Sequence, residues 1–184
     1  MRVITGLYKG GSLAAPKGLR TRPTASIVKE SMFNIIRFSL QGQNVLDLFC
    51  GSGQLGIEAL SGGAARAVFV DSCPRAVATV RRNLASLGVT SGFLVEKTDA
   101  LRYIRVSRES FGVVFADPPY ASTLLPQTLR ALALFDILAP DGIIVCEHGA
   151  GEPLPLAEGW RLSVSKRHGI KRISILTHEG GNAE

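Results

Sequence analysis

Cysteine and histidine are scarce in this chain of 184 residues. The three cysteines, Cys50, Cys73 and Cys146, are widely spaced without a CxxC pair, and the three histidines lie far apart. This pattern argues against a disulfide framework and offers no zinc-ligand or other metal-ligand spacing. We expect no bound metal, and we expect the three thiols to be reduced and to act as small buried apolar groups.

Long apolar runs are also missing. No segment approaches the ~18 to 20 uninterrupted apolar residues of a membrane-spanning helix, and the N-terminus lacks the apolar core of a secretory signal. We therefore expect a soluble, cytoplasmic protein with no membrane partner. The hydrophobic share of 46% suffices for a full core in one compact domain, which we expect to be a monomer.

The formal net charge of +6 lies entirely in the first 42 residues. Seven basic residues stand there against one acid, whereas fourteen bases and fourteen acids balance over residues 43–184. Such an arm favours a polyanionic partner, because neutralising phosphates releases counterions. A segment charged for solubility is the alternative. We predict a basic hairpin or arm plus helix at residues 1–42, which binds nucleic acid, and a main domain at residues 43–184.

A helix is predicted at the end of the arm, from about Thr24 to Leu40. Its apolar residues recur with helical spacing and form one face, which comprises Val28, Met32, Ile35, Ile36 and Leu40. Lys29 and Arg37 lie off that face. We expect this amphipathic helix to pack on the main domain.

From Asn44 onward, short apolar runs alternate with helical stretches. The runs predict strands at 44–49, 67–71, 92–96, 111–117 and 142–147, and the helical stretches lie at about 54–61, 74–87 and 123–138. This alternation is typical of a parallel sheet buried on both faces. Two final alternating stretches, 161–167 and 171–178, predict an antiparallel hairpin at the sheet edge. The predicted fold is therefore α/β and Rossmann-like, with a mainly parallel sheet of seven strands.

A glycine-rich loop follows the first predicted strand and opens the next predicted helix. Gly51 and Gly53 allow a tight turn and a close approach to a ligand. The spacing Gly51-x-Gly53-x-x-Gly56, with Asp71 ending the second strand, also matches the dinucleotide-binding pattern. A nicotinamide cofactor is therefore one candidate.

Acidic residues at successive strand ends favour S-adenosylmethionine instead. Asp47, still within the first strand, would repel a phosphate but attract the ammonium group of an amino acid. Asp71 suits the ribose of either cofactor, and Asp99 lies where it could accept a hydrogen bond from an adenine amino group. A chance Gly-x-Gly turn with unrelated acids is the alternative. We predict an S-adenosylmethionine site made of Asp47, Phe49, Gly51, Gly53, Asp71, Ser72, Asp99 and Ala100.

Asp117-Pro118-Pro119-Tyr120 ends the fourth predicted strand. Adjacent prolines cannot lie inside a central strand, so these residues must stand at its carboxyl end, the edge where α/β proteins bind ligands. An acidic side chain, a carbonyl held by proline and an aromatic ring suit one task, which is to grip a flat base that bears an amino group. An ordinary turn is the alternative. The glycine loop and the other acids favour the base-binding interpretation.

With these motifs, the chain resembles the bacterial methyltransferases that modify N2 of a guanine in the 16S rRNA of the small ribosomal subunit. The resemblance covers nearly the whole length and rests on Arg2–Gly6, Tyr8–Gly10, Gly18–Thr24, Val28–Glu30, Phe33-Asn34, the Asp47–Gly56 loop and Asp117–Tyr120. Arg22-Pro23-Thr24 is the more discriminating stretch, because Asp-Pro-Pro-Tyr is shared with amino-directed DNA methyltransferases. His168-Gly169 departs from the Tyr-Gly of the family pattern, although a histidine ring can still stack.

The resemblance implies a class I S-adenosylmethionine-dependent methyltransferase that acts on rRNA already folded with proteins in the small subunit. Asp117, Pro118 and Tyr120 would be catalytic, with Tyr120 stacking on a base that has left its own stack. The RNA contacts would be Lys9, Arg20, Arg22, Pro23 and Thr24. A DNA adenine-N6 methyltransferase and a non-catalytic RNA-binding assembly factor remain as alternatives.

Overall fold

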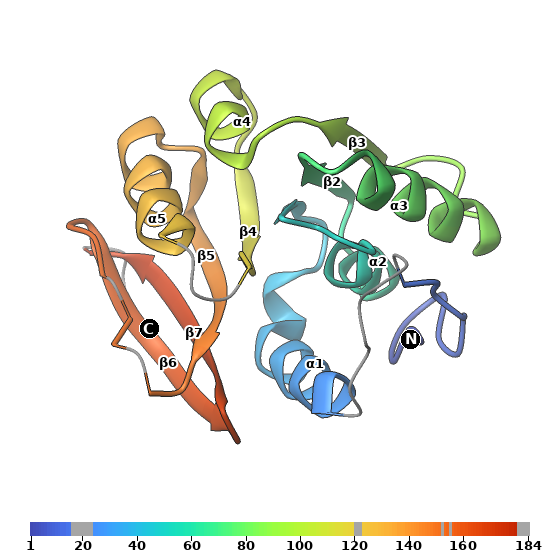
Figure 1. Ribbon diagram of the computed structural model, residues 1–184, viewed down its shortest axis with the longest axis horizontal. Coiled ribbons are helices and arrows are strands. Elements are labelled where there is room, and N and C mark those ends of the chain that lie inside the picture. Colours follow the sequence, from blue (N-terminus) through green and yellow to red (C-terminus); the bar gives the residue numbers. More distant parts are fainter. Residues whose placement is uncertain (16–23, 120–122, 152, 155, 180–184) are drawn as a thin grey trace.

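The computed structural model describes residues 1–15, 24–119, 123–151, 153–154 and 156–179. A seven-stranded sheet in the order β3-β2-β1-β4-β5-β7-β6 forms its centre (Figure 1). The parallel strands are β1 (Asn44–Leu48), β2 (Arg66–Asp71), β3 (Phe93–Lys97), β4 (Phe111–Ala116) and β5 (Leu138–Gly149). The antiparallel strands β6 (Trp160–His168) and β7 (Lys171–His178) complete the sheet, and β7 pairs with β5. The predicted parallel sheet with an edge hairpin is confirmed.

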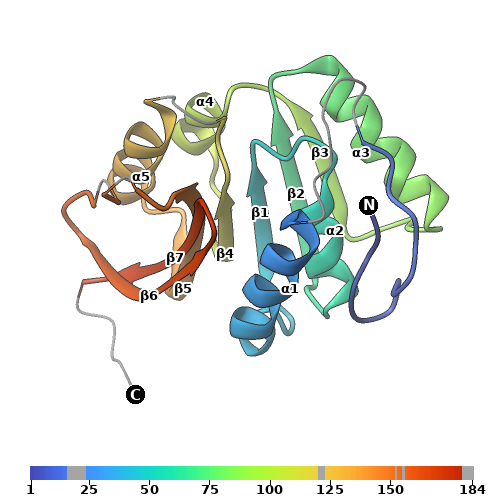
Figure 2. The same ribbon diagram turned by 60° about the horizontal axis from the view of Figure 1, so that its bottom comes forward.

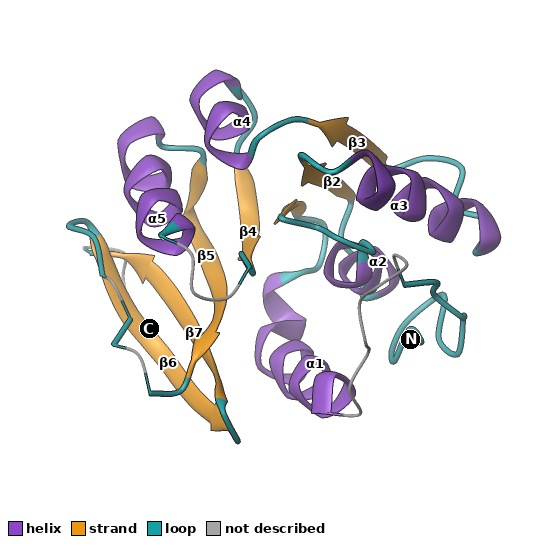
Figure 3. Cartoon of the chain, in the orientation of Figure 1, coloured by secondary structure: helices purple, strands orange, loops and turns teal. Residues whose placement is uncertain are grey.

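Helices cover both faces of the sheet, and those after the first connect its parallel strands (Figure 3). They are α1 (Thr24–Ile36), continued by the 3-10 turn Arg37–Ser39, α2 (Gln54–Ser61), α3 (Pro74–Ser86), α4 (Ala100–Val106) and α5 (Leu124–Phe135). Side chains alternate between the faces of a strand. Val113 and Phe115 of β4 therefore pack with α1, whereas Val114 and Ala116 pack with α4 and α5. Figure 2 shows α4 and α5 on the side of the sheet opposite α1.

Some element boundaries differ from the sequence prediction. The helix α4 was not expected, because only seven residues form it and its buried side chains, Tyr103 and Ile104, give too short a pattern to show a period. The helix predicted to reach residue 138 ends at Phe135, because Asp136 takes a left-handed conformation, with φ of 47°. The strand β5 then begins at Leu138, earlier than predicted.

The first fifteen residues pack against the main domain. Val3 and Leu13 are buried in one core cluster with Val80 and Leu84 of α3. The carboxylate of Glu58, on α2, is fully buried and accepts hydrogen bonds from the backbone N–H groups of the arm, at 2.9 Å from Ile4 and 2.8 Å from Thr5. This part of the arm is thus held by buried contacts.

A second finding on the arm corrects the expected position of Lys29. The sequence pattern placed this cation off the packed face of the helix, but its side chain is only 4% exposed. Its ammonium group pairs with Glu58 at 2.8 Å and donates to the backbone carbonyl of Arg2 at 2.7 Å. The pairing partner lies on another helix, so the spacing within α1 could not predict this burial.

Candidate active site

Four aspartates predicted from the sequence lie at or near the carboxyl edge of the sheet. The strand β1 stands where the order reverses, with β2 and β3 on one side and β4 and β5 on the other. Leu48 of β1 is in register with Val70 and with Ala116, so Asp71 and Asp117, the next residues, flank the end of β1. This switch point is where open α/β sheets bind ligands.

The glycine loop after β1 is closed by Asp71. The carboxylate of Asp71 accepts the backbone N–H of Gly51 at 2.9 Å and that of Cys73 at 2.8 Å, so it joins this loop to the start of α3. Gly51 and Gly53 have positive φ, of 55° and 75°, and the loop could not turn in this way with most other residues. Phe49 shares the left-handed conformation, with φ of 60°.

Gly56 permits the close packing of α2 on the sheet. A Cβ added here would stand 2.3 Å from Cε1 of Phe69 on β2. The backbone N–H of the same glycine donates to the Oδ2 atom of Asp47 at 2.9 Å. The glycine therefore serves the packing of the helix and the orientation of a buried carboxyl group.

Asp47 lies beneath the loop and is 1% exposed. Burial raises the pKa of its carboxyl to about 7, the hydrogen bond from Gly56 opposes that rise, and the charge of Asp71 adds to it. No cation pairs with Asp47 among the ion pairs of the described residues. A positively charged group placed beside this carboxyl would therefore be strongly favoured.

The remaining residues predicted for the cofactor lie around the same edge. Asp99 is exposed and caps α4, because its Oδ1 atom accepts the backbone N–H of Arg102 at 3.0 Å. Ala100 is buried behind it. Ser72 is exposed beside Asp71, and Phe49 packs partly against the core.

Asp117 follows a strand in which every residue is buried. The residue itself is half-buried, Pro118 is buried and Pro119 is exposed. Burial raises the pKa of the Asp117 carboxyl to about 7; nearby Glu147 adds to the rise, Lys171 opposes it, and Asp47 raises it further. At neutral pH this carboxyl can therefore both give and accept a proton.

Sequence reasoning missed Glu147 and Lys171, which form an ion pair with each other beside Asp117. Glu147 follows Cys146, the register partner of Ala116. The sequence held one signal for Glu147: it is the last residue of the apolar run predicted at 142–147, which forms the strand next to β4. The sequence did not show that the two strands were neighbours.

The residues predicted to contact RNA are only partly described. Lys9 is exposed in a turn of the arm. Thr24 begins α1. Arg20, Arg22 and Pro23, and the catalytic candidate Tyr120, lie outside the described residues.

The cysteines follow the prediction at two positions of three. Cys50, Cys73 and Cys146 are free thiols, and Cys50 and Cys146 are buried. Cys73 is exposed, which contradicts the expected burial, because it precedes α3 in the turn held by Asp71. Within the described ranges, no cluster of His, Cys, Asp or Glu could hold a metal ion. No helix in that part of the chain is long and apolar enough to cross a membrane.

Comparisons with known proteins agree with this architecture. A family model described as "Conserved hypothetical protein 95" matches residues 1–177. "Putative rRNA methyltransferase YlbH" of Bacillus subtilis is 41% identical over 184 residues, which are 98% of this chain and 100% of that protein. "Ribosomal RNA small subunit methyltransferase D" of Haemophilus influenzae is 32% identical over 173 residues, 92% of this chain and 90% of that protein.

A solved structure, "Putative methyltransferase yhhF from Escherichia coli", is similar with a TM-score of 0.86 and 29% identity, over 97% of this chain and 98% of that one. These findings confirm the Rossmann-like, class I methyltransferase fold and the resemblance noted from the sequence motifs. The chain belongs to the small-subunit rRNA methyltransferase D family.

Proposed function

We propose that this protein transfers a methyl group from S-adenosylmethionine to the exocyclic N2 of a guanine in 16S rRNA, within the assembled small subunit. The observation that carries the proposal is the position of Asp117 and Pro118, which follow β4 beside the end of β1 and its glycine loop. The candidate position of the base, at Asp117 and Pro118, therefore adjoins the candidate position of the methyl donor, at the glycine loop. The names of the relatives support rRNA as the substrate.

The residues at the sheet edge fit S-adenosylmethionine. A buried carboxyl with a raised pKa, Asp47, suits the ammonium group of the amino-acid end. Each carboxylate oxygen of Asp71 accepts one backbone N–H, and further lone pairs remain for ribose hydroxyls. Asp99 is exposed and one of its oxygens caps α4, so its other oxygen suits the adenine amino group. When bound, this cofactor would supply a methyl group activated by a sulfonium centre.

Asp117 and Pro118 would prepare the acceptor nitrogen. The lone pair of a guanine amino group is delocalised into the ring, so the nitrogen is a poor nucleophile. Hydrogen bonds accepted by the Asp117 carboxylate and the Pro118 carbonyl would favour a tetrahedral nitrogen with a localised lone pair. After the methyl group has arrived, the nitrogen releases one proton, and Asp117 takes it. A pKa of about 7 suits this step, because a large fraction of the carboxyl is ionised at neutral pH and can take the proton, and the protonated form can then give it to water.

The other predicted residues would hold the RNA. Tyr120 follows the prolines and would stack on the extruded base, a contact worth about 1–3 kcal/mol. Exposed Lys9 would contact phosphate, as would Arg20 and Arg22, while Pro23 and Thr24 lead into α1.

The substitution Asp117→Ala tests this proposal. Small subunits from a strain lacking the enzyme are incubated with protein and S-adenosylmethionine, and methylated nucleosides are identified by mass spectrometry. We expect N2-methylguanosine with the wild type and a loss of about 10²-fold or more in rate with the variant, because a positioning contact is removed. Cofactor affinity, measured by calorimetry, should be nearly unchanged.

The matched control is Asp141→Ala, because Asp141 is an exposed carboxylate on β5. It should retain the wild-type rate. An Asp117→Ala variant that keeps more than about a tenth of the rate would contradict the role of this residue. Methylation of adenine in place of guanine would contradict the choice of base.

A further inference from the structure

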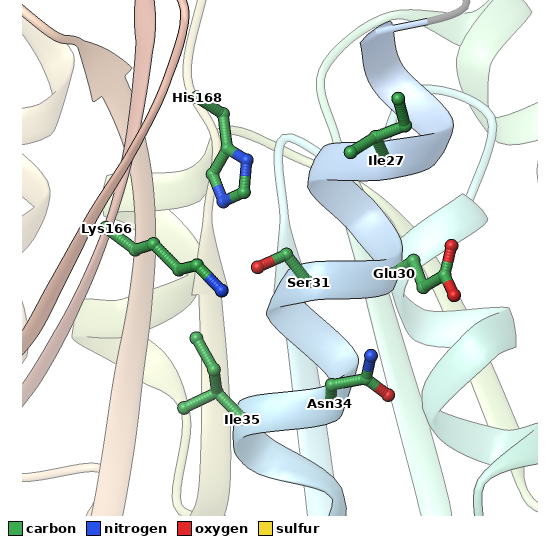
Figure 4. A pocket seen from close by; sticks show the side chains of 7 residues that line it. All are labelled: Ile27, Glu30, Ser31, Asn34, Ile35, Lys166 and His168. Carbon is green, nitrogen blue, oxygen red and sulfur yellow. The ribbon is translucent and has the colours of Figure 1, made fainter.

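A groove of about 370 Å³ separates α1 from the strand β6. Figure 4 shows side chains of α1 facing Lys166 and His168 across it. The α1 wall includes Ile27, Glu30, Ser31 and Asn34. This groove is not formed by the residues assigned to the methyl donor.

Two polar atoms that line the groove have no hydrogen-bond partner. They are Oγ of Ser31 and Nε2 of His168, and both are shielded from water. In Figure 4 the Ser31 hydroxyl points toward the β6 wall, and the His168 ring points toward α1. A buried polar atom without a partner destabilises the protein, so such atoms call for an explanation. A polar ligand that parts the walls slightly would give both atoms a partner, which would offset the cost of opening.

Both walls of the groove are connected to the surroundings of Asp117. On one side, His168 is in register with Lys171, which pairs with Glu147 and acts on the pKa of Asp117. On the other, the ring of Phe33 on α1 packs against Phe115, two residues before Asp117, with 5.6 Å between ring centroids. A chain that presents a base to Asp117 would therefore pass close to the groove.

The chemistry of the walls suits a nucleotide. The strands β6 and β7 hold five lysines and arginines and no aspartate or glutamate, and of these five cations Lys166 is the one at the groove wall. Lys166 lines the groove and can contact a phosphate. Ser31 on the facing wall offers a hydroxyl donor and acceptor for the edge of an unpaired base, and Asn34 lines the same wall. The volume lies near the lower end of the ~300–1,000 Å³ of small-ligand sites.

We propose that this groove binds an unpaired rRNA nucleotide that neighbours the target guanine, and so contributes to the choice of target. This inference rests on the proposed function and adds a specificity site to it. His168 is part of that site, in place of the tyrosine expected from the family pattern.

Two pairs of variants test the inference. Ser31→Ala and Thr128→Val each delete a buried hydroxyl without a partner, but only Ser31 lines the groove. Lys166→Gln and Arg161→Gln each remove one positive charge from β6, but only Lys166 lines the groove. Steady-state methylation of small subunits gives kcat and KM for the RNA, calorimetry gives cofactor affinity, and thermal denaturation gives stability.

We expect Ser31→Ala and Lys166→Gln each to lower kcat/KM for the small subunit at least about fivefold, mainly through KM. Cofactor affinity should stay at the wild-type value, and Ser31→Ala should melt no earlier than wild type, because it removes an unpaired atom. The kcat/KM of Thr128→Val and of Arg161→Gln for the small subunit should stay within about twofold of the wild-type value. The first pair separates a role of the groove from an effect on stability, and the second pair separates it from a general loss of positive charge.

Other results would overturn the inference. The nucleotide site alone would be refuted if the wild type is active and the groove variants keep kcat/KM within about twofold of it. Equal losses of kcat/KM in Lys166→Gln and Arg161→Gln would refute it in the same way. Either result would leave the proposed function intact. A wild-type protein that transfers no methyl group would refute the proposed function as well. A photoreactive benzoylphenylalanine at position 34 should cross-link to rRNA in small subunits. Cross-linking only to a ribosomal protein, or to nothing, would refute a nucleotide as occupant.

Discussion

Replacing Asp47 by asparagine should change how stability depends on pH. The carboxyl is 1% exposed, and burial raises its pKa from 3.8 to about 7. Because the pKa is higher in the folded state, ionisation opposes folding. Its cost is absent below the unfolded-state pKa, grows as the pH rises, and reaches its full size above about 7.

The size of the effect follows from the two pKa values. A tenfold difference in proton affinity corresponds to about 1.4 kcal/mol, so the ionised carboxyl lowers the free energy of unfolding by about 4 kcal/mol near pH 8 and by less than half of that near pH 5. An asparagine at this position keeps an oxygen acceptor for the N–H of Gly56 but buries amide donors, which costs about 1–3 kcal/mol. We expect Asp47→Asn to be more stable than wild type by about 2 kcal/mol near pH 8 and similar to it near pH 5.

Urea denaturation can measure this difference through the fluorescence of Trp160. It is the single tryptophan of the chain and is 2% exposed, so its emission reports the loss of the core. Asp141→Asn is the control, because this carboxylate is exposed, and its curve should follow that of the wild type. If Asp47→Asn and wild type differ by the same amount at pH 5 and pH 8, the ionisation of Asp47 does not limit stability and the argument is wrong.

Further predictions concern packing, the arm and the active site. Gly56→Ala places a Cβ against Phe69 and should lower the free energy of unfolding by about 1–3 kcal/mol, measured by urea denaturation; no change would disprove the close contact. Glu58→Gln leaves a buried lysine unpaired and should cost about 3–5 kcal/mol, with a loss below 1 kcal/mol in thermal denaturation counting against it. Asn83→Ala removes hydrogen bonds that join the arm to the glycine loop, so hydrogen exchange of the arm should accelerate; unchanged exchange would show that the apolar contacts suffice. The methylation rate should fall as the pH drops below about 7, because protonated Asp117 is a weaker acceptor for the amino group and cannot take its proton; a flat profile between pH 5.5 and 8 would exclude that role.

Much of the fold was predictable from local patterns. The strands β1, β2 and β4 each form a short apolar run, because central strands of such sheets are buried on both faces. The hairpin of β6 and β7 follows from two alternating stretches with a tight turn at Gly169, where φ is 61°. The helix α4 was not predictable in this way, since its seven residues span only about two turns.

The candidate site was predictable as a set of acids at strand ends but not as a network. Asp71 and Asp117 follow apolar runs, and parallel strands bring such ends to one edge. Their partners lie far apart in sequence: Glu147 and Lys171 belong to β5 and β7, and the pair affects Asp117 only because these strands are neighbours. The same holds for Lys29, which looked like a surface cation until α2 placed Glu58 beside it.

The sequence by itself determined the fold class, the carboxyl-edge placement of the Asp-Pro-Pro-Tyr motif and the glycine loop, because each depends on residues close together in the chain. The tertiary structure alone decided which charges are buried and which polar atoms lack partners. Burial and pairing depend on neighbours that the strand order and helix packing bring together, as with Ser31 on α1 and His168 on β6. It also revealed that the basic strand β6 faces α1 across a groove, which the charge count along the chain could not show.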